Sequence, residues 1–120
     1  MTSASVALAD VSLDDKYALD SGQVFLTGIQ AMVRLPILQR QRDQARGLNT
    51  GCYISGYRGS PLGGFDQQLW QAGKFLEANH IRFQPGLNED MAATAVWGSQ
   101  HLHLGPDPKY DGVFAIWYGK

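Results

Sequence analysis

Apolar and polar positions follow a helical period over residues 22–46, where apolar side chains recur from Phe25 to Leu38. This pattern predicts a helix that ends at Gly47, because glycine is favoured just beyond a helix end. Pro36 falls inside the pattern, and we expect it to kink or split the helix because proline has no amide donor. The interspersed charges predict a solvated face made of Arg34, Arg40, Arg42, Asp43 and Arg46.

Short apolar runs alternate with helical patterns along the rest of the chain. Strands are predicted over residues 51–57, 81–84 and 113–118, the last of them buried. Ser60 followed by Pro61 predicts the start of a helix that reaches about Ala78. Its buried face is expected to carry Phe65, Leu69, Ala72 and Leu76, and a later helix is capped by Asn88 with acidic residues in its first turn.

This order of elements predicts an α/β fold, a parallel sheet with helices on both faces. Residues 1–20 are expected to form an N-terminal arm, and residues 21–120 one domain that continues beyond this sequence. Ligands of such sheets bind beyond the carboxyl ends of the strands. Residues 57–64 and 85–90 follow two of these ends and are the candidate binding segments.

Composition excludes several classes of function. The 120 residues carry a formal net charge of −1 and no dense basic run, which makes nucleic acids and anionic membranes poor partners. No stretch of about 18 apolar residues predicts a membrane span. The single cysteine, Cys52, cannot form an internal disulfide, and the N-terminus does not resemble a signal peptide, so a cytoplasmic location is expected.

The two candidate segments could carry chemistry or only structure. The glycines of residues 55–64 let backbone approach a ligand, and the following helix offers amides to an anion, with Arg58 as a guanidinium partner. The spacing matches neither a Rossmann motif nor a P-loop. Equally, these glycines could simply turn the chain, and Glu89 could be an ordinary acidic residue favoured by the helix dipole. His101 and His103 point to different sides and are expected at the surface.

Three segments together resemble the N-terminal region of the indolepyruvate ferredoxin oxidoreductases, which belong to the 2-oxoacid:ferredoxin oxidoreductases. The resemblance covers about residues 11–120. The segments are Phe25-Leu-Thr-Gly-Ile-Gln-Ala-Met-Val-Arg-Leu-Pro36, Ile54-Ser-Gly-Tyr-Arg-Gly-Ser-Pro-Leu-Gly-Gly64 and Gly86-Leu-Asn-Glu-Asp-Met-Ala-Ala-Thr-Ala-Val-Trp-Gly98. The second and third motifs in this order are specific, whereas either alone would be weak.

The resemblance implies a pyrimidine-binding domain of a thiamine-diphosphate enzyme. Such enzymes convert aryl 2-oxoacids and coenzyme A to acyl-CoA and carbon dioxide, and pass electrons through iron–sulfur clusters to ferredoxin. Glu89 matches the glutamate that hydrogen-bonds the aminopyrimidine and favours its imino tautomer, which then takes the proton of thiazolium C2. Gly59 and Asn88 are the other implied cofactor-binding residues. Ser60 or Arg58 would meet the substrate carboxylate.

The same resemblance implies that the remaining machinery lies elsewhere. The magnesium-bound diphosphate is expected on another domain of the same enzyme or of its dimer mate, because a Gly-Asp-Gly…Asn motif is missing here. Cysteines that ligate iron–sulfur clusters are missing as well. We therefore expect a fragment that is inactive alone. Two alternatives stay open: another thiamine-diphosphate enzyme such as a decarboxylase or transketolase relative, and a non-catalytic α/β module. The tryptophans Trp70, Trp97 and Trp117 are expected to be core or interface anchors.

Overall fold

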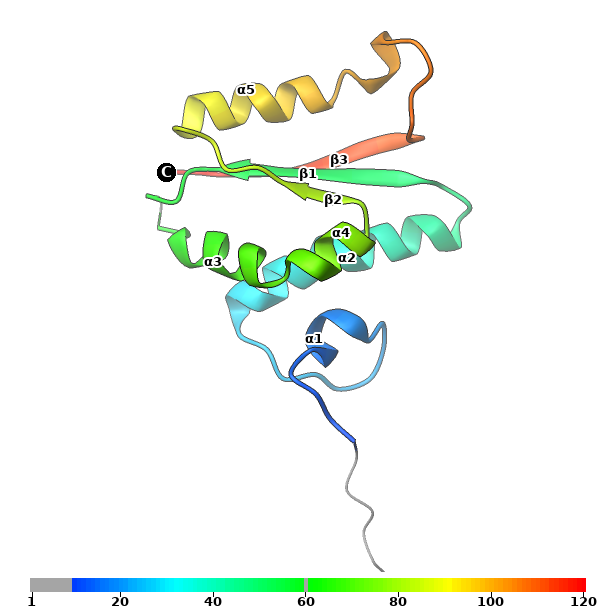
Figure 1. The fold of residues 1–120 in the computed structure, drawn as a ribbon, viewed down its shortest axis with the longest axis vertical. Helices are drawn as coiled ribbons and strands as arrows, with labels where there is room; N and C mark the ends of the chain where they lie inside the picture. Colours follow the sequence, from blue (N-terminus) through cyan, green and yellow to red (C-terminus); the bar gives the residue numbers. More distant parts are fainter. Residues whose placement is uncertain (1–9, 60) are drawn as a thin grey trace, which may run out of the picture.

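The computed structural model describes residues 10–59 and 61–120 and contains a parallel three-stranded sheet (Figure 1). The central strand is β1 (Thr50–Gly56), flanked by β2 (Ile81–Phe83) and β3 (Gly112–Tyr118). Both neighbours run parallel to β1, with Cys52 opposite Ile81 on one side and Phe114 on the other. The predicted parallel sheet is thus confirmed.

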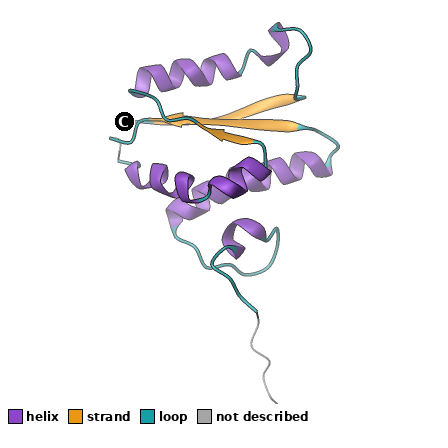
Figure 2. Cartoon of the chain, viewed as in Figure 1, coloured by secondary structure: helices purple, strands orange, loops and turns teal. Residues whose placement is uncertain are grey.

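Helices cover both faces of this sheet, as predicted (Figure 2). One face carries α2 (Gly28–Ala45), α3 (Gly63–Gln71) and α4 (Gly73–Ala78), and the other carries α5 (Glu89–Ser99) (Figure 1). A short 3-10 helix, η1 (Leu102–Leu104), leads from α5 toward β3. The small helix α1 (Asp15–Ala18) packs against α2.

The core lies between the sheet and helices α2, α3 and α4. The apolar face predicted for residues 61–78 is confirmed, because all four of its side chains are buried: Phe65, Leu69, Ala72 and Leu76. They pack with buried side chains of α2 and β1, namely Val33, Ile37, Cys52 and Ile54. This apolar contact anchors α3, and with it the glycine-rich loop that precedes the helix.

Helix α2 differs from the prediction at its start and its middle. It begins at Gly28, not at residue 22, and Phe25 lies before it with 85% of its surface exposed. Thr27 and Gln30 form a reciprocal capping box, which fixes this start. Pro36, predicted to kink or split the helix, does not split it, since the helix continues through this buried residue. Packing of both helical halves on the core offsets the missing hydrogen bond. Gly47 adopts φ +81° after the helix, as its role as a stop signal requires.

The face of α2 predicted to be solvated is partly buried. Arg40 is 3% exposed and Asp43 is 8% exposed. Arg40 donates to Asn49 Oδ1 at 2.9 Å and to the carbonyl oxygen of Thr50, while Asp43 accepts from Thr50 Oγ1 at 2.6 Å. These bonds tie both charged groups to the start of β1, although Nε of Arg40 is buried without a hydrogen-bond partner among the described residues.

The helix predicted from Ser60 and Pro61 begins later. Helix α3 starts at Gly63 after an N-cap at Leu62, so Pro61 is not its first residue. Ser60 lies outside the described residues. The predicted single helix is also interrupted at Ala72, which separates α3 from α4.

The three tryptophans are not core residues. Trp70, Trp97 and Trp117 are 62%, 67% and 44% exposed. Strand β3, predicted to be buried, is mostly half-buried, because it pairs with β1 alone and lies at an edge of the sheet. Within the described ranges, no helix is both long and apolar enough to cross a membrane.

Candidate functional site

The carboxyl edge of the sheet brings both sequence-predicted segments together. β1 ends at Gly56 and leads into residues 57–62, while β2 leads into residues 84–88. The amide of Gly86 donates to the carbonyl oxygen of Gly56 at 2.9 Å, which ties the two segments together. Figure 1 shows this end of the sheet beside the start of α5 and the start of α3.

Two glycines allow this edge to pack closely. A Cβ added to Gly56 would lie 2.5 Å from the ring and the carbonyl oxygen of Tyr118, at the end of β3. A Cβ added to Gly86 would lie 2.8 Å from the Cβ of Ala92 in α5. Neither position has room for a side chain, so the glycines set the spacing between the strand ends and α5.

Helix α5 begins as predicted. Asn88 is its N-cap, and the side-chain oxygen accepts a hydrogen bond from the amide of Met91 at 2.8 Å. Glu89 and Asp90 occupy the first turn, where the helix dipole favours acidic groups. Asn88 therefore has a capping role that fixes the position of Glu89.

Glu89 is half-buried at the carboxyl edge, beside the end of β3. Its carbonyl oxygen accepts a hydrogen bond from Trp117 Nε1 at 3.1 Å. A Cβ added to Gly119 would lie only 2.8 Å from Cγ of Glu89, so the glycine at position 119 leaves room for the glutamate side chain. Among the described residues, the carboxylate has neither a hydrogen-bond donor nor a cation within bonding distance. A half-buried carboxylate without a partner can share a proton with a ligand.

The loop after β1 contains the other predicted residues. Arg58 and Gly59 are exposed, and a Cβ on Gly59 would lie 2.5 Å from the ring of Tyr57. Ser60, the predicted hydroxyl of this loop, lies outside the described residues. Arg58 lines a hollow with residues of α3, whereas Glu89 belongs to the first turn of α5 on the other face of the sheet (Figure 1).

A buried polar pair beneath the loop was not predicted from sequence. Tyr118 Oη donates to Oδ1 of Asp66, and the two residues are 3% and 6% exposed. Burial raises the pKa of Asp66, and the charge of Arg58 opposes this rise. The pair joins the end of β3 to the first turn of α3. No local pattern could reveal it, because the partners lie 52 positions apart.

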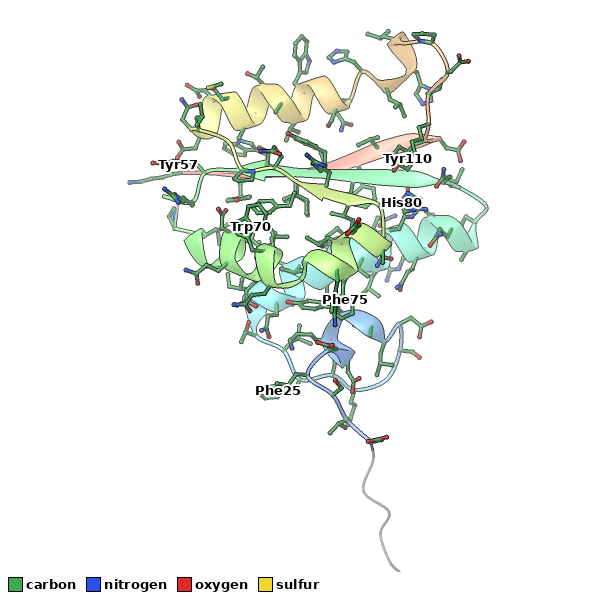
Figure 3. All side chains as sticks on the ribbon, viewed as in Figure 1. Phe25, Tyr57, Trp70, Phe75, His80 and Tyr110 are labelled. Carbon is green, nitrogen blue, oxygen red and sulfur yellow. The ribbon has the colours of Figure 1, made fainter. Side chains whose placement is uncertain are left out.

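Two hollows flank the β2 side of the molecule. One, of about 340 Å³, is lined by Arg58, Gly63, Asp66, Gln67 and Trp70 and opens beside the glycine-rich loop. A larger one of about 710 Å³ extends along β2 to His80 and Tyr110. Figure 3 places His80 and Tyr110 at the end of the sheet opposite Tyr57. The smaller hollow thus lies closer to the predicted chemistry.

The histidines lie away from this edge. His103 is exposed, and its Nε2 lies 2.9 Å from the carbonyl oxygen of Asp111, while the half-buried His101 contacts the ring of Trp97. Within residues 10–59 and 61–120, no three His, Cys, Asp or Glu side chains are grouped so as to hold a metal ion.

Comparisons of the chain with protein-family models, with curated proteins and with solved structures found no match.

Proposed function

We propose that this chain is the pyrimidine-binding portion of a thiamine-diphosphate-dependent 2-oxoacid:ferredoxin oxidoreductase acting on aryl 2-oxoacids. The observation that carries the proposal is the half-buried carboxylate of Glu89, which has no partner among the described residues and lies at the carboxyl edge of a parallel sheet. The resemblance of residues 54–64 and 86–98 to that family adds to it. Both lines of support concern the same few residues.

The residues at this edge fit the pyrimidine end of the cofactor. A ring nitrogen needs a carboxyl group that can share a proton, and Glu89 has no competing partner among the described residues. Gly119 and Gly56 keep side chains away from the carboxylate and the strand ends. Asn88 contributes indirectly, by capping the helix that carries Glu89.

The diphosphate end, its magnesium ion and the iron–sulfur clusters are assigned to other domains of the enzyme or its dimer mate. Bound thiamine diphosphate supplies a carbon nucleophile for oxoacid decarboxylation. Glu89 would hold the shared proton at the ring nitrogen, and Arg58 would offer its guanidinium to the carboxylate of the oxoacid. Gly59 keeps the loop backbone open to the cofactor, and Ser60 is proposed, from the sequence alone, as a second contact to the oxoacid. Coenzyme A and ferredoxin would be the other partners, in the cytoplasm.

The test is hydrogen exchange at C2 of thiamine diphosphate, followed by NMR in deuterated buffer with the enzyme that carries all its domains. We expect Glu89→Gln to slow this exchange by about 100-fold or more, because an amide cannot shift the proton. Glu89→Asp should also slow it, because the carboxyl group falls short by one methylene.

Asp90→Asn is the matched control, since Asp90 is exposed in the same helical turn. Exchange in this variant should equal that of the wild type. Undiminished exchange in Glu89→Gln would remove Glu89 from the role proposed for it.

A further inference from the structure

The hollow beside Arg58 combines a cation with an exposed aromatic ring. Its volume is about 340 Å³, and Arg58, Gln67 and Trp70 contribute side chains to its lining. Pockets of roughly 300 Å³ or more commonly hold small organic ligands. This hollow opens at the carboxyl edge of the sheet, next to the loop that follows β1.

Trp70 presents a large aromatic surface to this hollow. The residue is 62% exposed, although large apolar side chains gain free energy when they are buried. Its ring is held edge-on to Phe83 of β2, with 4.9 Å between the ring centroids and 67° between the planes. Figure 3 shows Trp70 extending from α3 toward the β2 side of the sheet. A held but exposed indole can pack against a planar ring at low entropic cost.

Arg58 supplies the charge. Among the described residues, its guanidinium forms neither an ion pair nor a hydrogen bond. The acidic residue that lines the hollow, Asp66, interacts with the charge of Arg58, but it is buried and accepts a hydrogen bond from Tyr118 Oη. The five donors of an arginine match a planar carboxylate in geometry.

We propose that this hollow binds a planar aromatic ring that carries a carboxylate, with Arg58 on the carboxylate and Trp70 against the ring. Trp70 is then the residue that selects aryl over alkyl side chains. The inference rests on the proposed function, because it takes the ligand to be the 2-oxoacid substrate.

The experiment measures binding of phenylpyruvate and of pyruvate to the chain by isothermal titration calorimetry. We expect phenylpyruvate to bind more tightly, and Trp70→Leu to reduce the ratio of the two affinities by about two- to tenfold. Trp70→Phe keeps a ring and should retain most of the preference. Arg58→Gln should weaken both ligands together, because both carry the carboxylate.

Trp97→Leu is the control, since Trp97 is 67% exposed on α5, on the opposite face of the sheet. In Trp97→Leu, the ratio of the affinities for phenylpyruvate and pyruvate should match that of the wild type. Circular dichroism should show that every variant is folded. A preference for phenylpyruvate that survives in Trp70→Leu, or no preference in the wild type, overturns the inference.

The two proposals fail separately. If Trp70 controls aryl binding but Glu89→Gln leaves C2 exchange intact, the aryl-carboxylate site stands and the cofactor role falls. If Glu89 controls the exchange but Trp70→Leu keeps the aryl preference, only the further inference is lost.

Discussion

Asp66 shows how a single buried carboxyl group is accommodated at the carboxyl edge. Its one described hydrogen bond comes from Tyr118 Oη, and the ring of Tyr118 packs at a steep angle against Phe65, with 5.2 Å between the centroids. Burial raises the pKa of Asp66 above its ordinary value of 3.8. The folded chain therefore binds this proton more tightly than the unfolded chain does.

This shift predicts a pH dependence of stability. The protonated carboxyl contributes stability that is fully present below pH 3.8 and is lost as the pH rises through the raised pKa of the folded state. Asn keeps an oxygen for Tyr118 but cannot ionise. We therefore expect Asp66→Asn to gain stability relative to the wild type as the pH rises through this window, measured by urea denaturation at a series of pH values.

Asp90→Asn serves as the comparison, because Asp90 is exposed and this substitution removes a carboxyl group from the surface instead of from the core. If Asp66→Asn and the wild type showed parallel stability curves across this window, burial of Asp66 would not control its titration.

At the scale of elements, helix starts decide where the site residues lie. Helix α5 begins where Asn88 and the following acidic pair predict, because a capping side chain and a helix dipole are local effects. The start of α2 also has a local signal, the Thr27-Gly-Ile-Gln30 capping box, which the apolar period extending from Phe25 obscured. By contrast, α3 starts at Gly63 because its apolar face is positioned by the core, and Ser60–Pro61 gives no hint of this.

The cap of α5 can be tested directly. Asn88→Ala removes the oxygen that accepts from Met91 N, and we expect the free energy of unfolding to fall by about 0.5–2 kcal/mol. Asn88→Asp keeps an acceptor and should stay close to the wild type. Urea denaturation followed by circular dichroism measures both. Equal stability of Asn88→Ala and the wild type would show that the cap contributes nothing.

At the scale of the whole molecule, the alternation of apolar runs was enough to predict a parallel sheet with helices on both faces. It could not predict which charged residues the fold buries. Arg40 and Asp43 lie on a surface-like pattern, yet both are buried and hydrogen-bonded to the polar start of β1. The tryptophans, expected to be core or interface anchors, are exposed on α3, α5 and the edge strand β3, because their residue type alone does not reveal which positions the fold covers.

For the candidate site, sequence located Glu89, Asn88 and Arg58 at one edge, since parallel strands share the direction of their carboxyl ends. The Tyr118–Asp66 pair and the neighbours of Glu89, Trp117 and Gly119, depend on the position of β3 in the sheet. These contacts join residues far apart in sequence, so no local pattern encodes them.

Cys52 in the central strand gives a measure of how the molecule opens as a whole. It is 4% exposed, and burial raises the pKa of its thiol to about 12. We expect this thiol to react with a disulfide reagent at pH 8 only when the sheet opens. Any change that raises the free energy of unfolding should therefore lower the rate of labelling. Labelling as fast as that of the urea-unfolded chain would contradict this burial.

The hydrogen bond from Trp117 Nε1 to the carbonyl oxygen of Glu89 places a fluorophore at the first turn of α5. In a chain whose other two tryptophans are replaced by phenylalanine, all indole emission would originate there. Its wavelength and its accessibility to a quencher would then register any molecule that enters beside the glutamate, so occupancy of this edge could be followed optically without a turnover assay.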